Sequence, residues 1–266
     1  MLHRKPTLDD GSAIITGLLL GMNLPSNLPV GIVILGAVVA IGIGKMTFGG
    51  LGCNLFNPAL VGRCMLLVSF PVQMTSWPVV GQQMSYTDAT TGATPLSLMK
   101  KAISSGNASV LDSMPSSLHL LLGNNVNGGA GTIGEVCALA LLLGLAFMLW
   151  KKIITWHIPV SIILSAFVFA SVLHIANPIY ADPISVVLTG GMMLGAIFMA
   201  TDYTTSPMTR RGQLIYGTAI GLLTIVIRNW GAYPEGMSFA ILIMNAFTPL
   251  INNYCKPKRF EEVLKK

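Results

Sequence analysis

The residues whose types suggest chemistry lie in one short polar segment, DATTGATPLSLMK, which runs from Asp88 to Lys100. This segment is too polar to cross a bilayer and carries too little charge for an ordinary solvated linker. Its glycine and alanine leave the neighbouring threonine hydroxyls open to an approaching group. Pro95 biases Thr94 away from helix, which keeps that hydroxyl presented. The same two residues can also form the N-cap and first position of a helix, and this geometry would itself expose the hydroxyl.

The sequence DATTGATPL resembles the flavinylation motif, an aspartate followed after a short gap by Ser/Thr-Gly-Ala-Thr. The resemblance implies that an extracytoplasmic flavin transferase joins the phosphate of flavin mononucleotide (FMN) to the last threonine hydroxyl. Thr94 would carry this phosphoester, as in a phosphoprotein. The recognition motif would be Asp88, Thr91, Gly92 and Ala93. Small neighbours and an extended backbone suit the role, because the hydroxyl must enter the active site of another enzyme.

The composition predicts an all-α, polytopic membrane protein. Of 266 residues, 53% are hydrophobic and only 10% are charged, whereas soluble domains carry about 25% charge. The net charge of +6 is interpreted through its placement as a topology signal, and no nucleic-acid partner is expected. Four cysteines lie far apart, and we interpret them as buried apolar residues and not as metal ligands or disulfides.

Apolar segments near the length of a membrane span predict eight helices, several of them short or interrupted by glycine and proline. Interrupted helices at membrane depth need surrounding protein or a cavity, so we expect a helical bundle with broken helices. The predicted segments are Ser12–Asn23, Val30–Met46, Asn57–Phe70, Ile133–Trp150, Ile153–Ile175, Ile184–Ala200, Leu214–Ile227 and Met237–Tyr254.

If these segments alternate in direction, the basic residues of five loops or tails fall on one side, which the positive-inside rule assigns to the cytoplasm. The flavinylation motif then lies outside, and short outer turns are expected at 176–183 and 228–236. The predicted division is a first membrane repeat with three spans (1–71), an extracytoplasmic loop (72–131), a second repeat with five spans (132–254) and a cytoplasmic tail (255–266).

Two pairs of segments suggest an internal duplication. The segment 14–25 resembles 186–202, and 57–71 resembles 233–249, at offsets between 173 and 178 residues. Five spans separate the copies, so the second copy is expected to be inverted. Inverted repeats of broken helices indicate a binding site between the two halves, although Thr-Gly and Pro can also recur by chance in glycine-rich spans.

Several blocks together resemble the D subunit of the Rnf complex, the ion-translocating ferredoxin:NAD oxidoreductase. They include GGLGCNLFNPALVG, GGMMLGAIFMATD and AYPEGMSFAILIMNAFTPLI, and the resemblance extends from Leu8 to about Phe260. It implies a ten-span inverted-repeat fold like that of urea transporters. The first two spans are not present here, so Met1 is not expected to be the true start.

The resemblance also implies a function. The chain would be a flavoprotein electron-transfer subunit in the bacterial inner membrane, with FMN on Thr94 and riboflavin as a candidate second flavin. It would couple electron transport to Na⁺ or H⁺ translocation and catalyse no complete reaction alone. Partners would be the other components of the Rnf complex (A, B, C, E and G), the flavin transferase during maturation, and the lipid bilayer.

Two alternatives stay open at this point. The chain could correspond to the related NqrB component of the sodium-pumping NADH:quinone reductase, which shares the flavin motif. It could also be a urea-transporter-like solute channel without redox function, although that leaves the flavinylation motif unexplained.

Ionisable residues within the predicted spans are functional candidates. Arg63 either contacts a flavin phosphate, pairs with a carboxylate, or reaches the interface and neutralises helix carbonyls. Asp202 either binds a cation or fixes the loop that follows it. Glu135 is interpreted as structural because it lies near a helix N-terminus. Met192, Met193 and Met199 are expected in the core. No catalytic residue and no metal site are predicted.

Overall fold

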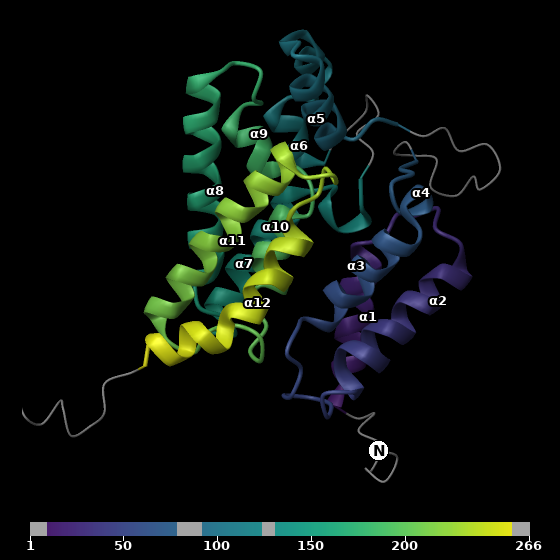
Figure 1. Ribbon diagram of the computed structural model, residues 1–266, viewed down its shortest axis with the longest axis vertical. Coiled ribbons are helices and arrows are strands. Elements are labelled where there is room, and N and C mark those ends of the chain that lie inside the picture. The colour runs from purple at the N-terminus through teal and green to yellow at the C-terminus, as the bar shows by residue number, and fades with distance from the viewer. Residues whose placement is uncertain (1–9, 79–91, 124–130, 257–266) are drawn as a thin grey trace, which may run out of the picture.

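The computed structural model describes residues 10–78, 92–123 and 131–256, and every regular element within these ranges is a helix. Figure 1 shows two groups of helices side by side. The first contains α1–α4, and the second contains α7–α12 with α5 and α6 at one end. The predicted all-α fold is therefore confirmed.

The first group begins with α1 (Ser12–Met22) and α2 (Val30–Val38). α2 continues without interruption as the π-helical segment η2 (Val39–Met46), and α3 (Pro58–Ser69) and the short α4 (Pro71–Met74) follow. α3 starts where it does because Asn57 caps it. The side-chain oxygen of Asn57 accepts from the backbone N–H of Ala59 at 3.1 Å and of Leu60 at 3.4 Å, and a proline occupies the first helical position, where no N–H is needed.

The connecting region and the second group account for the remaining helices. The connecting region contains α5 (Pro95–Ser105), η3 (Ala108–Ser113), α6 (Ser117–Leu122) and η4 (Ile133–Glu135). The second group contains α7 (Ala138–Trp150), α8 (His157–Ala176), α9 (Pro183–Leu188), α10 (Met192–Leu194), η5 (Gly195–Met199), α11 (Arg210–Trp230) and α12 (Met237–Tyr254).

Each of the eight predicted apolar segments contains helix, and three of them change geometry or break. α2 becomes π-helical, η4 ends at Glu135 before α7 begins at Ala138, and α9 ends at Leu188 before α10 begins. α12 contains Pro249 but is one continuous helix. Within the described part of the chain, one helix, α8, combines the length and apolar composition of a membrane span. Short and broken helices are what the glycine and proline pattern predicted.

The direction of the matched segments agrees with an inverted duplication. In Figure 1, α1 and α3 run towards the end of the molecule that carries α5, whereas η5 and α12 run away from it. The threonine shared by one pair of segments has the same local role in both copies. Thr16 donates to the carbonyl oxygen of Ser12 at 2.9 Å, and Thr189 donates to that of Ser185 at 2.7 Å.

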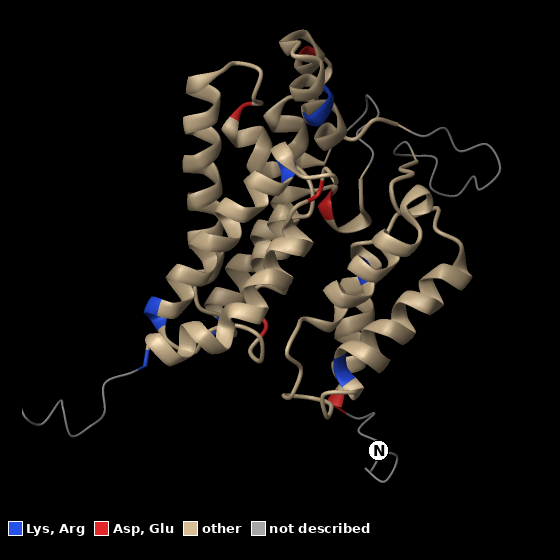
Figure 2. Cartoon of the chain, viewed as in Figure 1, with Lys and Arg blue, Asp and Glu red and all other residues tan. Residues whose placement is uncertain are grey.

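Apart from a few in the middle of the molecule, the charged residues of the described ranges lie at its two ends (Figure 2). The basic residues at the end of η2 and the start of α11 lie at one end, and those of α5 lie at the other. Between the ends, many large apolar side chains face outwards, including Leu164, Val168, Val172 and Ile175 along α8. An apolar belt between charged ends is the surface that a bilayer requires.

The tightest helix contact joins α8 and α11. A Cβ atom added to Gly217 of α11 would lie 3.0 Å from the carbonyl oxygen of Ile158, and one added to Gly221 would lie 2.6 Å from that of Ile162. Small residues let helix backbones approach in this way. Met192, Met193 and Met199 lie in the core of the second group, so that prediction is confirmed.

Candidate functional site

Thr94 caps α5, as the sequence predicted. Its backbone is extended (φ −71°, ψ 152°), and its Oγ1 accepts from the backbone N–H of Ser97 at 3.1 Å. The expectation that this geometry exposes the hydroxyl is wrong, because Thr94 is only 7% exposed. The cap places its side chain in the wall of a pocket between the two helix groups.

Of the four other motif residues, the structure describes Gly92 and Ala93. The N–H of Gly92 donates to the carbonyl oxygen of Trp77 at 2.9 Å, which ties the motif to the segment after α4. Ala93 is exposed. Asp88 and Thr91 lie outside the described residues, so their predicted role in recognition stays a prediction.

The pocket beside Thr94 lies between the two helix groups. Its walls are partly apolar and partly aromatic, and the ring of Tyr233 is fixed by stacking on Phe239 at 5.8 Å between centroids. Three ionisable side chains also face it. The lining includes Arg63, Leu67, Met74, Trp77, Thr94, Leu96, Glu135, Tyr233, Pro234 and Glu235.

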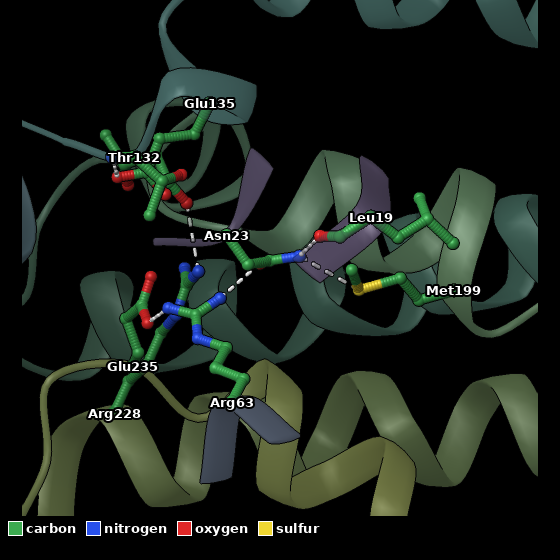
Figure 3. Close-up of polar contacts among 9 residues, drawn as sticks. Leu19, Asn23, Arg63, Thr132, Glu135, Met199, Arg228 and Glu235 are labelled. Carbon is green, nitrogen blue, oxygen red and sulfur yellow. Dashed lines mark hydrogen bonds and ion pairs between the residues drawn. The ribbon is translucent and has the colours of Figure 1, made fainter. Parts of the chain in front are cut away.

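Arg63 on α3 lies between the two helix groups and is 3% exposed. Its guanidinium forms an ion pair with the carboxylate of Glu235 and donates to the side-chain oxygen of Asn23 (Figure 3). Of the alternatives that the sequence left open, pairing with a carboxylate is confirmed. The side chain does not reach the interface. Its Nε has no hydrogen-bond partner among the described residues, so one donor is left for a ligand.

Arg228 is a second buried arginine that the sequence interpretation missed. Residues 228–236 were expected to form an outer turn, but α11 continues to Trp230 and Arg228 is 5% exposed. Its guanidinium donates to the carbonyl oxygens of Val186 at 2.7 Å and Thr189 at 2.9 Å. These carbonyls lie where α9 breaks, so Arg228 supplies the hydrogen bonds that the broken helix has lost.

Glu135 completes the charged centre. Its Oε1 accepts from the backbone N–H of Thr132 at 2.9 Å, as a residue near a helix N-terminus can. Its side chain lines the same pocket as Arg63 and Glu235, which places it in the charged centre. Two arginines and two glutamates give the centre a formal charge near zero, which suits a buried position.

Several polar atoms of this centre are buried without a partner in the described part of the chain. They are Nε of both arginines, Oε2 of Glu135 and Oε1 of Glu235. Buried polar groups normally have hydrogen-bond partners, and here Arg63, Glu135 and Glu235 line the pocket beside Thr94, whereas Arg228 does not. The arrangement is therefore suited to a ligand with its own donors and acceptors.

Adjacent glycines bring the backbone close to both arginines. Gly190 has φ +69°, a conformation that favours glycine, and a Cβ atom added to it would lie 2.8 Å from Nη2 of Arg228. A Cβ atom added to Gly191 would lie 3.6 Å from Nη1 of Arg63. The Gly-Gly pair of GGMMLGAIFMATD thus shapes one wall of the centre.

A chain of polar contacts continues from the centre into the core. Asn23 donates to the carbonyl oxygen of Leu19 at 2.8 Å and contacts the sulfur of Met199 at 3.4 Å. Asn57 donates to the carbonyl oxygen of Met199, the last residue of η5, at 3.0 Å. These contacts join α1 and α3 of the first group to the π-helical segment of the second.

Asp202 fixes the loop after η5. Its carboxylate accepts from Thr204 at 3.0 Å, Thr205 at 3.2 Å and Asn54 at 3.3 Å. All three partners donate hydrogen bonds to the carboxylate, which agrees with the loop-fixing interpretation. The described residues contain no group of three acidic, histidine or cysteine side chains that could hold a metal.

The fold and site together define a class: a helical protein with an apolar exterior, whose two groups of broken helices enclose ionised residues beside a threonine in a pocket. The chain belongs to the NQR2, RnfD, RnfE family, whose sequence model matches residues 1–261.

Relatives support this assignment. The chain is 47% identical over 258 residues to the D subunit of the Na⁺-translocating ferredoxin:NAD⁺ oxidoreductase complex of Acetobacterium woodii, covering 97% of this chain and 75% of the relative. It is 41% identical over 261 residues to the D subunit of the proton-translocating ferredoxin:NAD⁺ oxidoreductase complex of Clostridium ljungdahlii, covering 97% and 77%. It is 40% identical over 278 residues to the D subunit of the ion-translocating oxidoreductase complex of Klebsiella pneumoniae, covering 96% and 79%.

Proposed function

We propose that this chain is a covalently flavinylated, integral-membrane electron-transfer subunit of an ion-translocating ferredoxin:NAD⁺ oxidoreductase complex. Membership of the NQR2, RnfD, RnfE family and the names of the relatives support the complex and its chemistry. The partners would be the other components of that complex (A, B, C, E and G). The relatives' names assign Na⁺ to one complex and H⁺ to another, so the proposal is made for a monovalent cation.

The observation that carries the proposal is the position of Thr94. Its hydroxyl-bearing side chain lines the same pocket as Arg63, Trp77 and Glu235. A flavin joined to Thr94 would therefore have a pocket directly beside its attachment point. Attachment to an exposed loop would need no such pocket.

The residues present fit a phosphodiester at Thr94. The N-terminus of α5 begins at the next residue, and helix N-termini favour negative charge. The unpaired Nε of Arg63 adds a buried cationic donor in the same pocket. Arg63 is thus proposed to favour the phosphate, in addition to its observed pairing with Glu235.

The flavin ring would supply the redox chemistry, and the protein would supply position and electrostatics. Trp77 and Tyr233 offer aromatic walls on which a planar ring can stack. The apolar side chains of Leu67 and Met74, which also line the pocket, limit the access of water to it. The charges of the arginines and glutamates balance, so no unpaired protein charge would lie beside the flavin ring when the charge of the ring changes on reduction. No residue of this chain is proposed to break or form a bond in the electron-transfer step.

The proposed orientation places Thr94 and α5 outside the cytoplasm and both basic chain ends inside. Two observations support it. The basic residues of five loops or tails fall on one side of the predicted spans, and those of η2 and α11 lie at the end of the molecule opposite to α5 (Figure 2). Riboflavin as a second, noncovalent flavin stays part of the proposal on the family resemblance alone.

The test is covalent flavin fluorescence. We expect the full chain, expressed with its flavin transferase, to fluoresce yellow on a denaturing gel. Thr94→Val should abolish the fluorescence, Thr94→Ser should retain a measurable fraction because it keeps a hydroxyl, and Thr90→Val, outside the motif residues, should leave it intact. A dark wild-type band in cells where the transferase labels a known substrate would remove the redox proposal and favour a solute channel.

A further inference from the structure

A second pocket lies beside the pocket of Thr94, and two residues, Leu96 and Pro234, line both. Helices α5, α8 and α11 contribute most of its walls (Figure 1). These walls are apolar, with Met99, Ile103, Ala170, Leu173, Val186 and Ile225 among them. The covalent flavin proposed above does not account for this pocket, because Thr94 does not line it.

Two cationic side chains line this apolar pocket. Arg228 is 5% exposed, and both of its Nη atoms donate to carbonyl oxygens, but within the described ranges its Nε is buried without a partner. Lys100 donates to the carbonyl oxygen of Gly231, and an ammonium group has three donors. Among the described residues, no aspartate or glutamate lines the pocket. Glu135 acts on Arg228 from the pocket beside Thr94.

Lys100 lies on α5, outside the predicted spans. Partial burial lowers the pKa of its ammonium group, because removing water disfavours the charged form. An anion in the pocket would raise the pKa of Lys100 again, because charge-assisted hydrogen bonds would replace the lost solvation. The pocket therefore offers positive charge that the described residues lining it do not neutralise.

The surroundings of the pocket indicate where such an anion would come from. Val172 and Ile175 near the end of α8 face outwards and are 58% and 84% exposed. The exposed ring of Trp230 lies 6.3 Å from the ring of Tyr180, which lines the pocket. Tryptophan and tyrosine are enriched where the apolar core of a bilayer meets its polar boundary. The pocket is thus placed at the level of lipid headgroups.

We propose that this pocket binds one anionic phospholipid, with its phosphate at Arg228 and Lys100 and part of an acyl chain against Leu173 and Ile225. This inference relies on the membrane location proposed above but not on the flavin. A neutral quinone would fit the apolar walls and leave Lys100 without an anionic partner in the pocket. A free phosphate would satisfy the cations and leave the apolar walls empty.

The experiment uses the full chain, purified in mild detergent from its native membrane with the subunits that accompany it. Native mass spectrometry would count the phospholipids retained on the chain after stepwise delipidation. We expect one tightly held anionic phospholipid on the wild type. Retention should fall about tenfold in Lys100→Gln, which removes one charge-assisted hydrogen bond. Leu173→Trp should reduce retention by filling the pocket. Lys101→Gln is the matched control, because Lys101 is exposed and does not line the pocket.

Equal retention by all four proteins would overturn the proposal and indicate surface lipid only. A retained quinone or fatty acid in place of a phospholipid would overturn it as well. In a second arm, thermal stability of the delipidated protein should rise with phosphatidylglycerol and not with phosphatidylcholine or inorganic phosphate. Covalent flavin fluorescence of each variant reports separately on the function proposed above, so failure of one proposal is distinguishable from failure of the other.

Discussion

Arg63 on α3 and Glu235, which follows α11, form a buried ion pair that joins the two groups of helices. The same guanidinium holds Asn23 at the end of α1, and Asn23 contacts Met199 at the end of η5. The pair therefore connects the pocket beside Thr94 to the broken helix of the second group. An electrostatic change in the pocket would act first on this connection.

Replacing one partner of the Arg63–Glu235 pair should destabilise the protein more than replacing both. Arg63→Met leaves the carboxylate of Glu235, which is 14% exposed, without its partner; removing one partner of a buried pair costs about 3–5 kcal/mol, which sets the upper limit here. The double variant Arg63→Met, Glu235→Leu should recover most of this loss. Thermal unfolding in detergent measures both. Arg211→Met, at an exposed position, is the control. If the double variant is as unstable as Arg63→Met, the uncompensated charge is not the cause.

The contact between α8 and α11 should not tolerate even one added methyl group. A Cβ atom at Gly221 would lie 2.6 Å from the carbonyl oxygen of Ile162, so Gly221→Ala must separate the helices. We expect a loss of about 1–3 kcal/mol from overpacking. Gly17→Ala is the matched control, because no atom of the described residues lies within 4 Å of a Cβ atom there and α1 should gain helix propensity. Unfolding midpoints that move equally would contradict the packing argument.

The sequence was sufficient to predict the eight apolar helical segments because long apolar segments and their glycine and proline breaks are local signals, whereas η3 and α6 were not predicted. It also predicted the cap at Thr94, since Thr-Pro before an amphipathic segment specifies a helix start locally. The pairing of Arg63 was only one of several alternatives. Its partner follows α11, and contact between positions so far apart depends on how the two helix groups pack.

Arg228 was assigned to a turn because its charge ends the apolar run of α11. A signal against this was present in the spacing. Gly217, Gly221, Thr224 and Arg228 recur every three or four residues and form one buried face. A charged residue in register with small buried residues indicates a buried position better than hydropathy does. The burial of Thr94 had no such signal, because the pocket walls come from segments distant in sequence.

Replacing Arg228 by lysine should disturb the break in α9. Arginine supplies two donors to two carbonyl oxygens, whereas lysine is a point charge that cannot reproduce this fork. We expect Arg228→Lys to lower stability by about 1–3 kcal/mol, the cost of leaving a buried polar group unpaired. Arg210→Lys at the exposed start of α11 should be silent. Unchanged unfolding of Arg228→Lys would show that the carbonyls find other partners.

The burial of Thr94 predicts an order of events in maturation. With 7% exposure, its side chain cannot enter another enzyme's active site while α5 is packed, so attachment should precede packing or require α5 to move. Unmodified folded protein incubated with flavin transferase and flavin adenine dinucleotide should therefore label slowly. Met99→Ala should speed labelling, because Met99 is one of the residues by which α5 packs and its truncation costs about 2–5 kcal/mol. Ser104→Ala, at an exposed position of α5, should label at the wild-type rate. Rapid, complete labelling of the folded wild type would show that the packed position of Thr94 is not what limits attachment.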